Sequence, residues 1–142
     1  MYIDGDGCPV VDIAIRLSLQ AKTNCIIICD TSHVFDRAGA QTIIVPKGND
    51  SVDFTLVNMI QKGDIVITQD YGLAAMCLAR GTFPISQDGM LYTHRIMDAL
   101  LMRRNNTRKM RMAGGRPKGP PKRTSQQDVA FEAALKELLI LV

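Results

Sequence analysis

Apolar residues along the chain fall into short runs separated by stretches of helical spacing. The runs have strand length and cover residues 1–4, 25–29, 41–45, 64–68 and 83–86. Between them, apolar residues recur at every third or fourth position, which predicts helices over residues 9–19, 51–62, 70–80 and about 93–102. This alternation predicts an α/β fold whose mostly parallel sheet of about five strands carries helices on both faces.

The composition changes toward the C-terminal part of the chain. Residues 114–125 are rich in glycine, proline and basic residues, which excludes a helix interior or a central strand. The amphipathic stretch that follows has an apolar face that must pack on the body or on a second copy in a homodimer. We therefore expect an α/β domain over 1–102, a basic arm over 103–125 and a C-terminal helix over 126–142.

The formal net charge of +3 conceals a strong asymmetry. No acidic residue lies between Asp98 and Asp128, and nine of the 17 basic residues do, which leaves eight against all 14 acidic residues elsewhere. The basic arm has two interpretations, a surface that binds a polyanion and a solvated linker. A segment with nine cations and no acid beside an acidic body favours the first. The arm has no aromatic residue, so base stacking would come from Phe35, Tyr71 or Tyr92. The expected nucleic-acid-binding residues are Arg103, Arg104, Arg108, Lys109, Arg111, Arg116, Lys118, Lys122 and Arg123.

Short acidic side chains follow two of the expected strands. Asp4 ends the first strand, Asp6 lies two residues further on, and Asp70 follows the fourth strand. Active sites of open parallel sheets form beyond the carboxyl ends of the strands, so these carboxylates converge if the two strands are neighbours. Clustered carboxylates repel each other unless a cation or protons intervene, and oxygen ligands favour Mg²⁺ or Mn²⁺. Such ions promote phosphodiester hydrolysis.

The acidic residues also have structural interpretations. Asp50 and Asp70 suit the N-cap position of helices, and for Asp50 the cap is the favoured interpretation. Asp53 suits a first turn, where the helix dipole favours an acid, and it shares a helix face with Asp50. Asp64 suits a solvated strand start.

The four cysteines form no C-x-x-C pair, and neither histidine lies near them in sequence, so we expect free thiols rather than a zinc site or disulfides. Cys8 stands at the mouth of the first helix, where a thiol pKa could fall, but a small structural residue is favoured there. No apolar run approaches the ~20 residues of a membrane span, and no secretory pattern is visible, so the expected compartment is the cytoplasm.

Four motifs in this order resemble the YaiI/YqxD family of bacterial proteins (UPF0178, DUF188), which is related to PIN-like nuclease domains. They are Asp4-x-Asp6-x-Cys8-Pro9-Val10, Gly63-Asp64-x-Val66-Ile67-Thr68-x-Asp70-x-x-Leu73-Ala74, Gly89-x-Leu91-Tyr92-Thr93, and Gly119-Pro120-Pro121 through Asp128-x-x-x-Phe131. The resemblance implies a PIN-like three-layer sandwich, with Asp4, Asp6, Asp53 and Asp70 on the family's acidic positions. Gly7 stands where alanine is expected, a departure that leaves the acidic positions intact.

PIN-like domains are usually Mg²⁺- or Mn²⁺-dependent ribonucleases, so the leading hypothesis is a metal-dependent nuclease acting on RNA, by analogy at the level of the fold. A haloacid-dehalogenase-type phosphatase is a second hypothesis, because Asp4-Gly5-Asp6-Gly7 is similar to its nucleophile loop, although Cys8 departs from that pattern. The third hypothesis is a non-catalytic RNA-binding or regulatory module.

Overall fold

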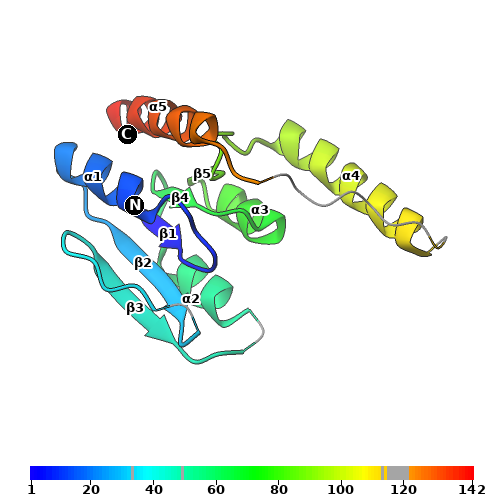
Figure 1. The fold of residues 1–142 in the computed structure, drawn as a ribbon, viewed down its shortest axis with the longest axis horizontal. Helices are drawn as coiled ribbons and strands as arrows, with labels where there is room; N and C mark the ends of the chain where they lie inside the picture. The colour runs from blue at the N-terminus through cyan, green and yellow to red at the C-terminus, as the bar shows by residue number, and fades with distance from the viewer. Residues whose placement is uncertain (33, 49, 113, 115–121) are drawn as a thin grey trace.

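A computed structural model describes residues 1–32, 34–48, 50–112, 114 and 122–142 (Figure 1). Within these ranges five strands form one sheet in the order β3-β2-β1-β4-β5, and every pair of neighbours is parallel. The expected sheet is confirmed, with the first and fourth strands side by side at its centre. The strands are β1 (Tyr2–Asp4), β2 (Ile26–Asp30), β3 (Gln41–Val45), β4 (Ile65–Ile67) and β5 (Phe83–Ile85).

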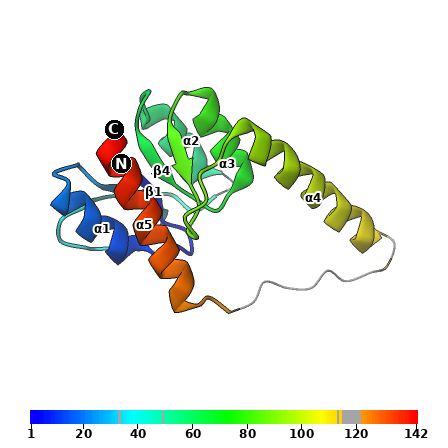
Figure 2. The same cartoon turned by 90° about the horizontal axis from the view of Figure 1, so that it is seen from above.

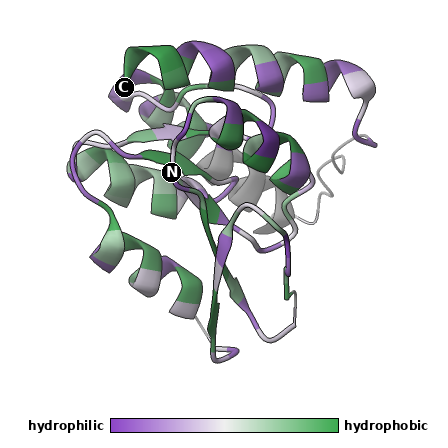
Figure 3. Cartoon of the chain, turned by 90° about the vertical axis from the view of Figure 1, so that its left-hand side faces the viewer, coloured by the Kyte–Doolittle hydropathy of each residue, from purple (hydrophilic) through white to green (hydrophobic). Residues whose placement is uncertain are grey.

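Helices cover both faces of the sheet, and the alternation of strand side chains divides the core into two clusters. Ile3 and Ile27 pack with α1 and α5 on one face, whereas Ile28 and Val66 pack with α2 and α3 on the other. The three-layer α/β sandwich is thereby confirmed, with hydrophobic strands enclosed between helices (Figure 3). The helices are α1 (Val11–Gln20), α2 (Ser51–Met59), α3 (Tyr71–Ala79), α4 (His94–Met112) and α5 (Ser125–Leu141).

The C-terminal helix α5 packs on its own domain. Phe131 and Leu135 are fully buried in the cluster that contains Ile3 of β1. Gly89 approaches α5 so closely that an added Cβ would lie 2.6 Å from the Ala130 carbonyl oxygen. The centre of the expected apolar face is therefore covered within one chain, whereas Val129 and Leu141 remain exposed.

Helix α4 is longer than its apolar spacing indicates. Its first turns are fixed against α3, because Met97 is buried with Ala74 and Tyr92. The helix then continues to Met112, past the expected end at about residue 102, and extends away from the sheet (Figures 1 and 2). The extension contains Arg, Lys and Met, which favour helices, and no glycine or proline before Gly114. The first part of the basic arm is consequently helical.

None of the helices in the described ranges is both long and apolar enough to cross a bilayer. All four cysteines are buried and free, as expected from their spacing.

If α5 is part of the domain core, Phe131→Ala will lower the free energy of unfolding by about 3 to 5 kcal/mol, because it opens a cavity between sheet and helix. Urea denaturation measures this difference. Val129→Ala on the same helix is the control, since Val129 is 67% exposed and its truncation should change the stability by less than about 0.5 kcal/mol. Equal effects of the two substitutions, or an unfolding midpoint that rises with protein concentration, would contradict packing within one chain.

Candidate functional site

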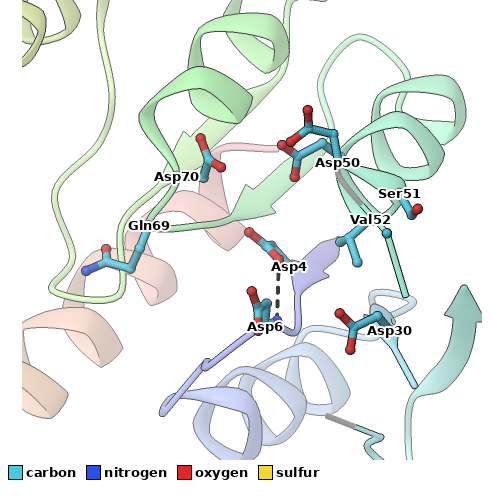
Figure 4. A pocket seen from close by; sticks show the side chains of 10 residues that line it. Asp4, Asp6, Asp30, Asp50, Ser51, Val52, Gln69 and Asp70 are labelled. Atoms are coloured by element: carbon cyan, nitrogen blue, oxygen red, sulfur yellow. Dashed lines mark hydrogen bonds between the residues drawn. The ribbon is translucent and has the colours of Figure 1, made fainter. Parts of the chain in front are cut away.

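An open pocket of about 360 Å³ lies at the carboxyl end of the sheet, between the N-terminal ends of α2 and α3 (Figure 4). Its acidic side chains come from segments far apart in the sequence: the ends of β1 and β2, the start of α2 and the residue that precedes α3. The aspartates that line it are Asp4, Asp6, Asp30, Asp50, Asp53 and Asp70. The structure thus brings all four predicted metal-binding residues to one pocket.

Asp4 is the buried carboxylate of this pocket. Because Ile3 faces α1 and α5, the next side chain of the strand points to the opposite face, toward α2 and α3. Asp4 is 8% exposed, and its Oδ2 accepts a hydrogen bond of 2.8 Å from the Thr68 hydroxyl. Burial raises the pKa of Asp4, and the nearby charges of Asp6 and Asp70 raise it further.

Thr68 connects two of the aspartates. Its hydroxyl donates to Asp4 and accepts a hydrogen bond of 3.0 Å from the backbone N–H of Asp70. The carbonyl of Thr68 in turn accepts a hydrogen bond of 3.1 Å from the Tyr92 hydroxyl. The sequence motifs around Asp4, Asp70 and Tyr92 therefore meet at one buried residue, Thr68, through its hydroxyl and its carbonyl. Sequence reasoning gave Thr68 no role, because its partners are set by the neighbouring strand.

Tyr92 is 2% exposed and packs edge to face on Tyr71, with ring centroids 6.3 Å apart. The suggestion that Tyr92 stacks on bases is wrong, because its ring is enclosed in the core and its hydroxyl supports Thr68.

Helix α2 contributes Asp50 and Asp53. Asp50 occupies the expected N-cap position, with a left-handed backbone (φ 60°), but its side chain does not make the capping hydrogen bond that this position usually carries. Asp53 lies in the first turn and is partly buried. Burial, and then the charges of Asp70, Asp4, Asp50 and Asp6, raise the pKa of Asp53 to about 6.

Asp70 is both a helix N-cap and a residue of the acidic pocket, the two roles that its sequence position allowed. Its Oδ1 accepts a hydrogen bond of 3.1 Å from the backbone N–H of Leu73, which caps α3. The same residue lines the pocket (Figure 4). Capping uses one carboxylate oxygen and holds the side chain at the pocket, so it is compatible with ligand binding by the other oxygen.

The donor set suits a hard cation. Within the described ranges, no three His, Cys, Asp or Glu side chains are arranged to hold one ion between them. Mg²⁺ commonly uses only one or two protein carboxylates and keeps several waters, and the oxygens of Asp4, Asp6, Asp53 and Asp70 fit that chemistry. A positive charge here would offset the repulsion that raises the pKa of Asp4 and Asp53.

Sequence reasoning missed several residues that line the pocket, among them Asp30 and Gln69. Asp30 ends β2, the neighbour of β1, and its Oδ1 accepts a hydrogen bond of 2.7 Å from the Ser32 N–H. The strand-end rule that selected Asp4 also applies to Asp30. Gln69 precedes Asp70, and its Oε1 accepts a hydrogen bond of 3.0 Å from the Gln87 N–H.

Cys8 is a buried neutral thiol at neutral pH, because burial raises its pKa to about 11. An activated thiolate requires a lowered pKa, so the raised pKa of Cys8 agrees with the favoured interpretation of a structural residue. The preceding residue, Gly7, has a φ of 63°, a conformation that favours glycine.

Among the expected nucleic-acid-binding residues, Arg123 has a structural role in the domain. Its guanidinium forms ion pairs with Asp128 at 2.8 Å and Asp88 at 3.0 Å, and donates to the Gln87 carbonyl at 2.7 Å. Arg103 and Lys122 are exposed. Arg104, Arg108, Lys109 and Arg111 belong to α4, and their side chains, like Arg116 and Lys118 as a whole, lie outside the described part of the chain.

The raised pKa of Asp53 predicts a pH-dependent gain of stability in Asp53→Asn. The pKa of Asp53 is about 6 in the folded protein, against an ordinary value of 3.8. The folded state therefore binds the proton more tightly than the unfolded state, which stabilises the fold below about pH 4. This stabilisation is lost as the pH rises through 6. The variant should therefore be more stable than the wild type by about 1 kcal/mol near pH 7.5, after discounting for partial exposure, and show no gain near pH 4.

Denaturant unfolding at the two pH values measures this difference. Asp98→Asn, which changes an exposed carboxylate outside the pocket, is the matched control and should show no such gain. A gain of the same size at both pH values would show that charge repulsion is not its cause.

Comparisons with known proteins agree with the sequence motifs. The model of the uncharacterised YaiI/YqxD family matches residues 2–140. A UPF0178 protein of Exiguobacterium sibiricum is 51% identical over 98% of this chain and 95% of its own length. Those of Clostridium acetobutylicum and Enterococcus faecalis are 42% and 37% identical, over 99% and 98% of this chain and 96% of their own lengths. No solved structure matches significantly. The chain belongs to the YaiI/YqxD family.

Proposed function

We propose that this protein is a divalent-metal-dependent nuclease that hydrolyses RNA phosphodiesters at the aspartate pocket. The observation that carries the proposal is the convergence of Asp4, Asp6, Asp53 and Asp70 from three separate segments on one pocket. Carboxylates that are raised in pKa by burial and by one another indicate a site that gains free energy when it takes up a cation.

The aspartates differ in what they offer to such chemistry. Asp4 is fixed by Thr68 and by the Asp6 N–H, and is suited to anchor Mg²⁺ or Mn²⁺. Asp6 and Asp70 are exposed at the mouth of the pocket, where they would contact the ion through the waters that it keeps. The ion, when bound, supplies a Lewis acid for the phosphoryl oxygen and an activated water. The protein contributes position and charge.

The arrangement favours a nuclease over the phosphatase alternative. In the phosphatase alternative Asp4 must itself reach a phosphorus atom, which is difficult for a side chain that is 8% exposed and held by the Thr68 hydroxyl and the Asp6 N–H. In the nuclease, a cation would lie between Asp4 and the phosphate, so Asp4 can stay where it is. One observation supports the non-catalytic RNA-binding alternative: the basic part of α4 extends away from the sheet (Figure 2) and would bind a polyanion without the pocket.

Asp4→Asn and Asp70→Asn should each lower Mn²⁺-dependent RNA cleavage by at least about 100-fold, since even the outer-shell partners of metal ligands contribute about 10- to 100-fold. Both variants should fold, because asparagine still offers Thr68 an acceptor at position 4 and is a good N-cap at position 70. Cleavage of a broad RNA panel, with circular dichroism melting, measures both effects. Asp98→Asn is the control.

Wild-type protein that cleaves no RNA in the panel with Mn²⁺ or Mg²⁺ would overturn the proposed activity. Cleavage that persists unchanged in Asp4→Asn would assign the activity to another site or to a contaminant.

RNA binding through α4 predicts a specific change in salt dependence. The triple change of Arg104, Arg108 and Arg111 to Gln should reduce the slope of log K against log salt by about 2, since each lost phosphate contact on a single strand contributes about 0.7. Fluorescence anisotropy with labelled RNA in EDTA measures the slope. Arg80→Gln, at the exposed C-cap of α3, is the control and should leave it unchanged.

An unchanged slope in the triple variant would exclude α4 as the RNA-binding surface. Wild-type binding with no cleavage, unaffected by Asp4→Asn, would favour the non-catalytic module.

A further inference from the structure

Gln69 lies between the aspartate pocket and the point where the basic arm rejoins the domain. On one side it follows Thr68, precedes Asp70 and lines the pocket. On the other side its Oε1 accepts the Gln87 N–H at 3.0 Å, and the carbonyl of Gln87 accepts a hydrogen bond from Arg123 at 2.7 Å. A short chain of hydrogen bonds therefore connects the pocket to Arg123.

Arg123 fixes the end of the arm to the domain. Its ion pairs reach Asp88, in the loop after β5, and Asp128, in the first turn of α5. Lys122, the preceding residue, is exposed. The C-terminal end of the basic segment is thus held beside Gln87, on the side of the pocket where Gln69 lies.

A phosphodiester that approaches this pocket meets mainly negative charge. Among the described residues that line it, every charged one is an aspartate, and the uncharged polar side chains are those of Ser51 and Gln69. A phosphate oxygen requires hydrogen-bond donors, and a carboxylate offers none when ionised. A side-chain amide is suited to this place because it can donate a hydrogen bond to a phosphate oxygen and carries no positive charge. It therefore leaves the negative charge of the aspartates available to a cation.

The hydrogen bond to Gln87 sets the orientation of the Gln69 amide. Because Oε1 accepts the Gln87 N–H, the NH₂ group is the end that can serve a ligand. Figure 4 shows Gln69 on the side of Asp4 and Asp70 opposite to Asp30 and Asp50, with its nitrogen pointing away from the aspartates. The donors therefore face outward at the rim of the pocket, where the Gln69 side chain is exposed.

We propose that Gln69 is a substrate-positioning residue whose side-chain amide donates to a phosphate of a nucleic-acid strand running from the Arg123 end of the basic arm into the pocket. The inference rests on the proposed nuclease function and deepens it, because it gives the strand a direction across the site.

Gln69→Glu isolates the amide donors. Glutamate has the same shape and keeps an acceptor for the Gln87 N–H, but it replaces the NH₂ group by an oxygen that repels phosphate. Gln20→Glu is the control, since it makes the same change of charge at the exposed C-terminal end of α1, away from the pocket. The probe is a fluorescein-labelled single-stranded RNA in EDTA, and cleavage with Mn²⁺ gives KM and kcat separately.

The Gln69→Glu variant should bind RNA at least about tenfold more weakly than wild type, the loss typical of a hydrogen bond to a charged group, whereas Gln20→Glu changes affinity less than about twofold. KM should rise by the same factor, with a smaller change in kcat, and the melting temperature should stay at the wild-type value. A purely structural role would lower the melting temperature and leave the affinity of the folded protein unchanged.

The failures are distinguishable. If wild type binds and cleaves RNA and Gln69→Glu behaves like Gln20→Glu, the inference is overturned and the nuclease proposal stands. If wild type neither binds nor cleaves RNA, the proposed function fails and takes the inference with it. If Gln69→Glu melts early, Gln69→Met, which has neither donor nor acceptor, decides: RNA affinity equal to wild type overturns the inference.

Discussion

Six aspartates that share one pocket repel one another, and one of them lies at the end of the central strand with little access to water. Burial and the surrounding charges raise the pKa of Asp4 and of Asp53, so the folded protein holds these two groups at a cost. Parallel topology makes the proximity unavoidable, since β1 and β4 are neighbours and their carboxyl ends meet at one edge. The site depends on how the fold offsets this repulsion.

The fold offsets it in two ways. Hydrogen-bond donors lie where the carboxylates are: the Thr68 hydroxyl serves Asp4, and the N–H of Leu73 serves Asp70. Apolar burial then holds the framework together, with one cluster on each face of the sheet and α5 completing the cluster around Ile3. A network of this kind keeps the acids in place without neutralising them, which is what a cation-binding pocket requires.

Much of this arrangement follows from the sequence, because it rests on local periodicity and on a general rule of parallel sheets. The strand runs predict the sheet, and the rule brings Asp4, Asp6 and Asp70 together, while the family resemblance adds Asp53. The rest depends on tertiary partners that spacing does not encode. Nothing local distinguishes Arg123 from the other cations of the arm, and only the fold places it between Asp88 and Asp128.

Opposite charges in one chain would cancel if the arm folded back on the pocket. In the two parts of the arm that the structure describes in an element or an ion pair, α4 and Arg123, the chain does not do so. Arg123 forms ion pairs with Asp88 and Asp128, neither of which lines the pocket. From the buried Met97 to Met112 the chain is one helix, so at 1.5 Å per residue its basic end lies roughly 20 Å beyond its point of attachment. The backbone of this helix leads away from the sheet, and hence away from the acids at its carboxyl end (Figures 1 and 2). Under the proposed function, this separation would leave the pocket open to a cation and the basic part of α4 open to a phosphate backbone, and a polyanion long enough to span both would contact the two together.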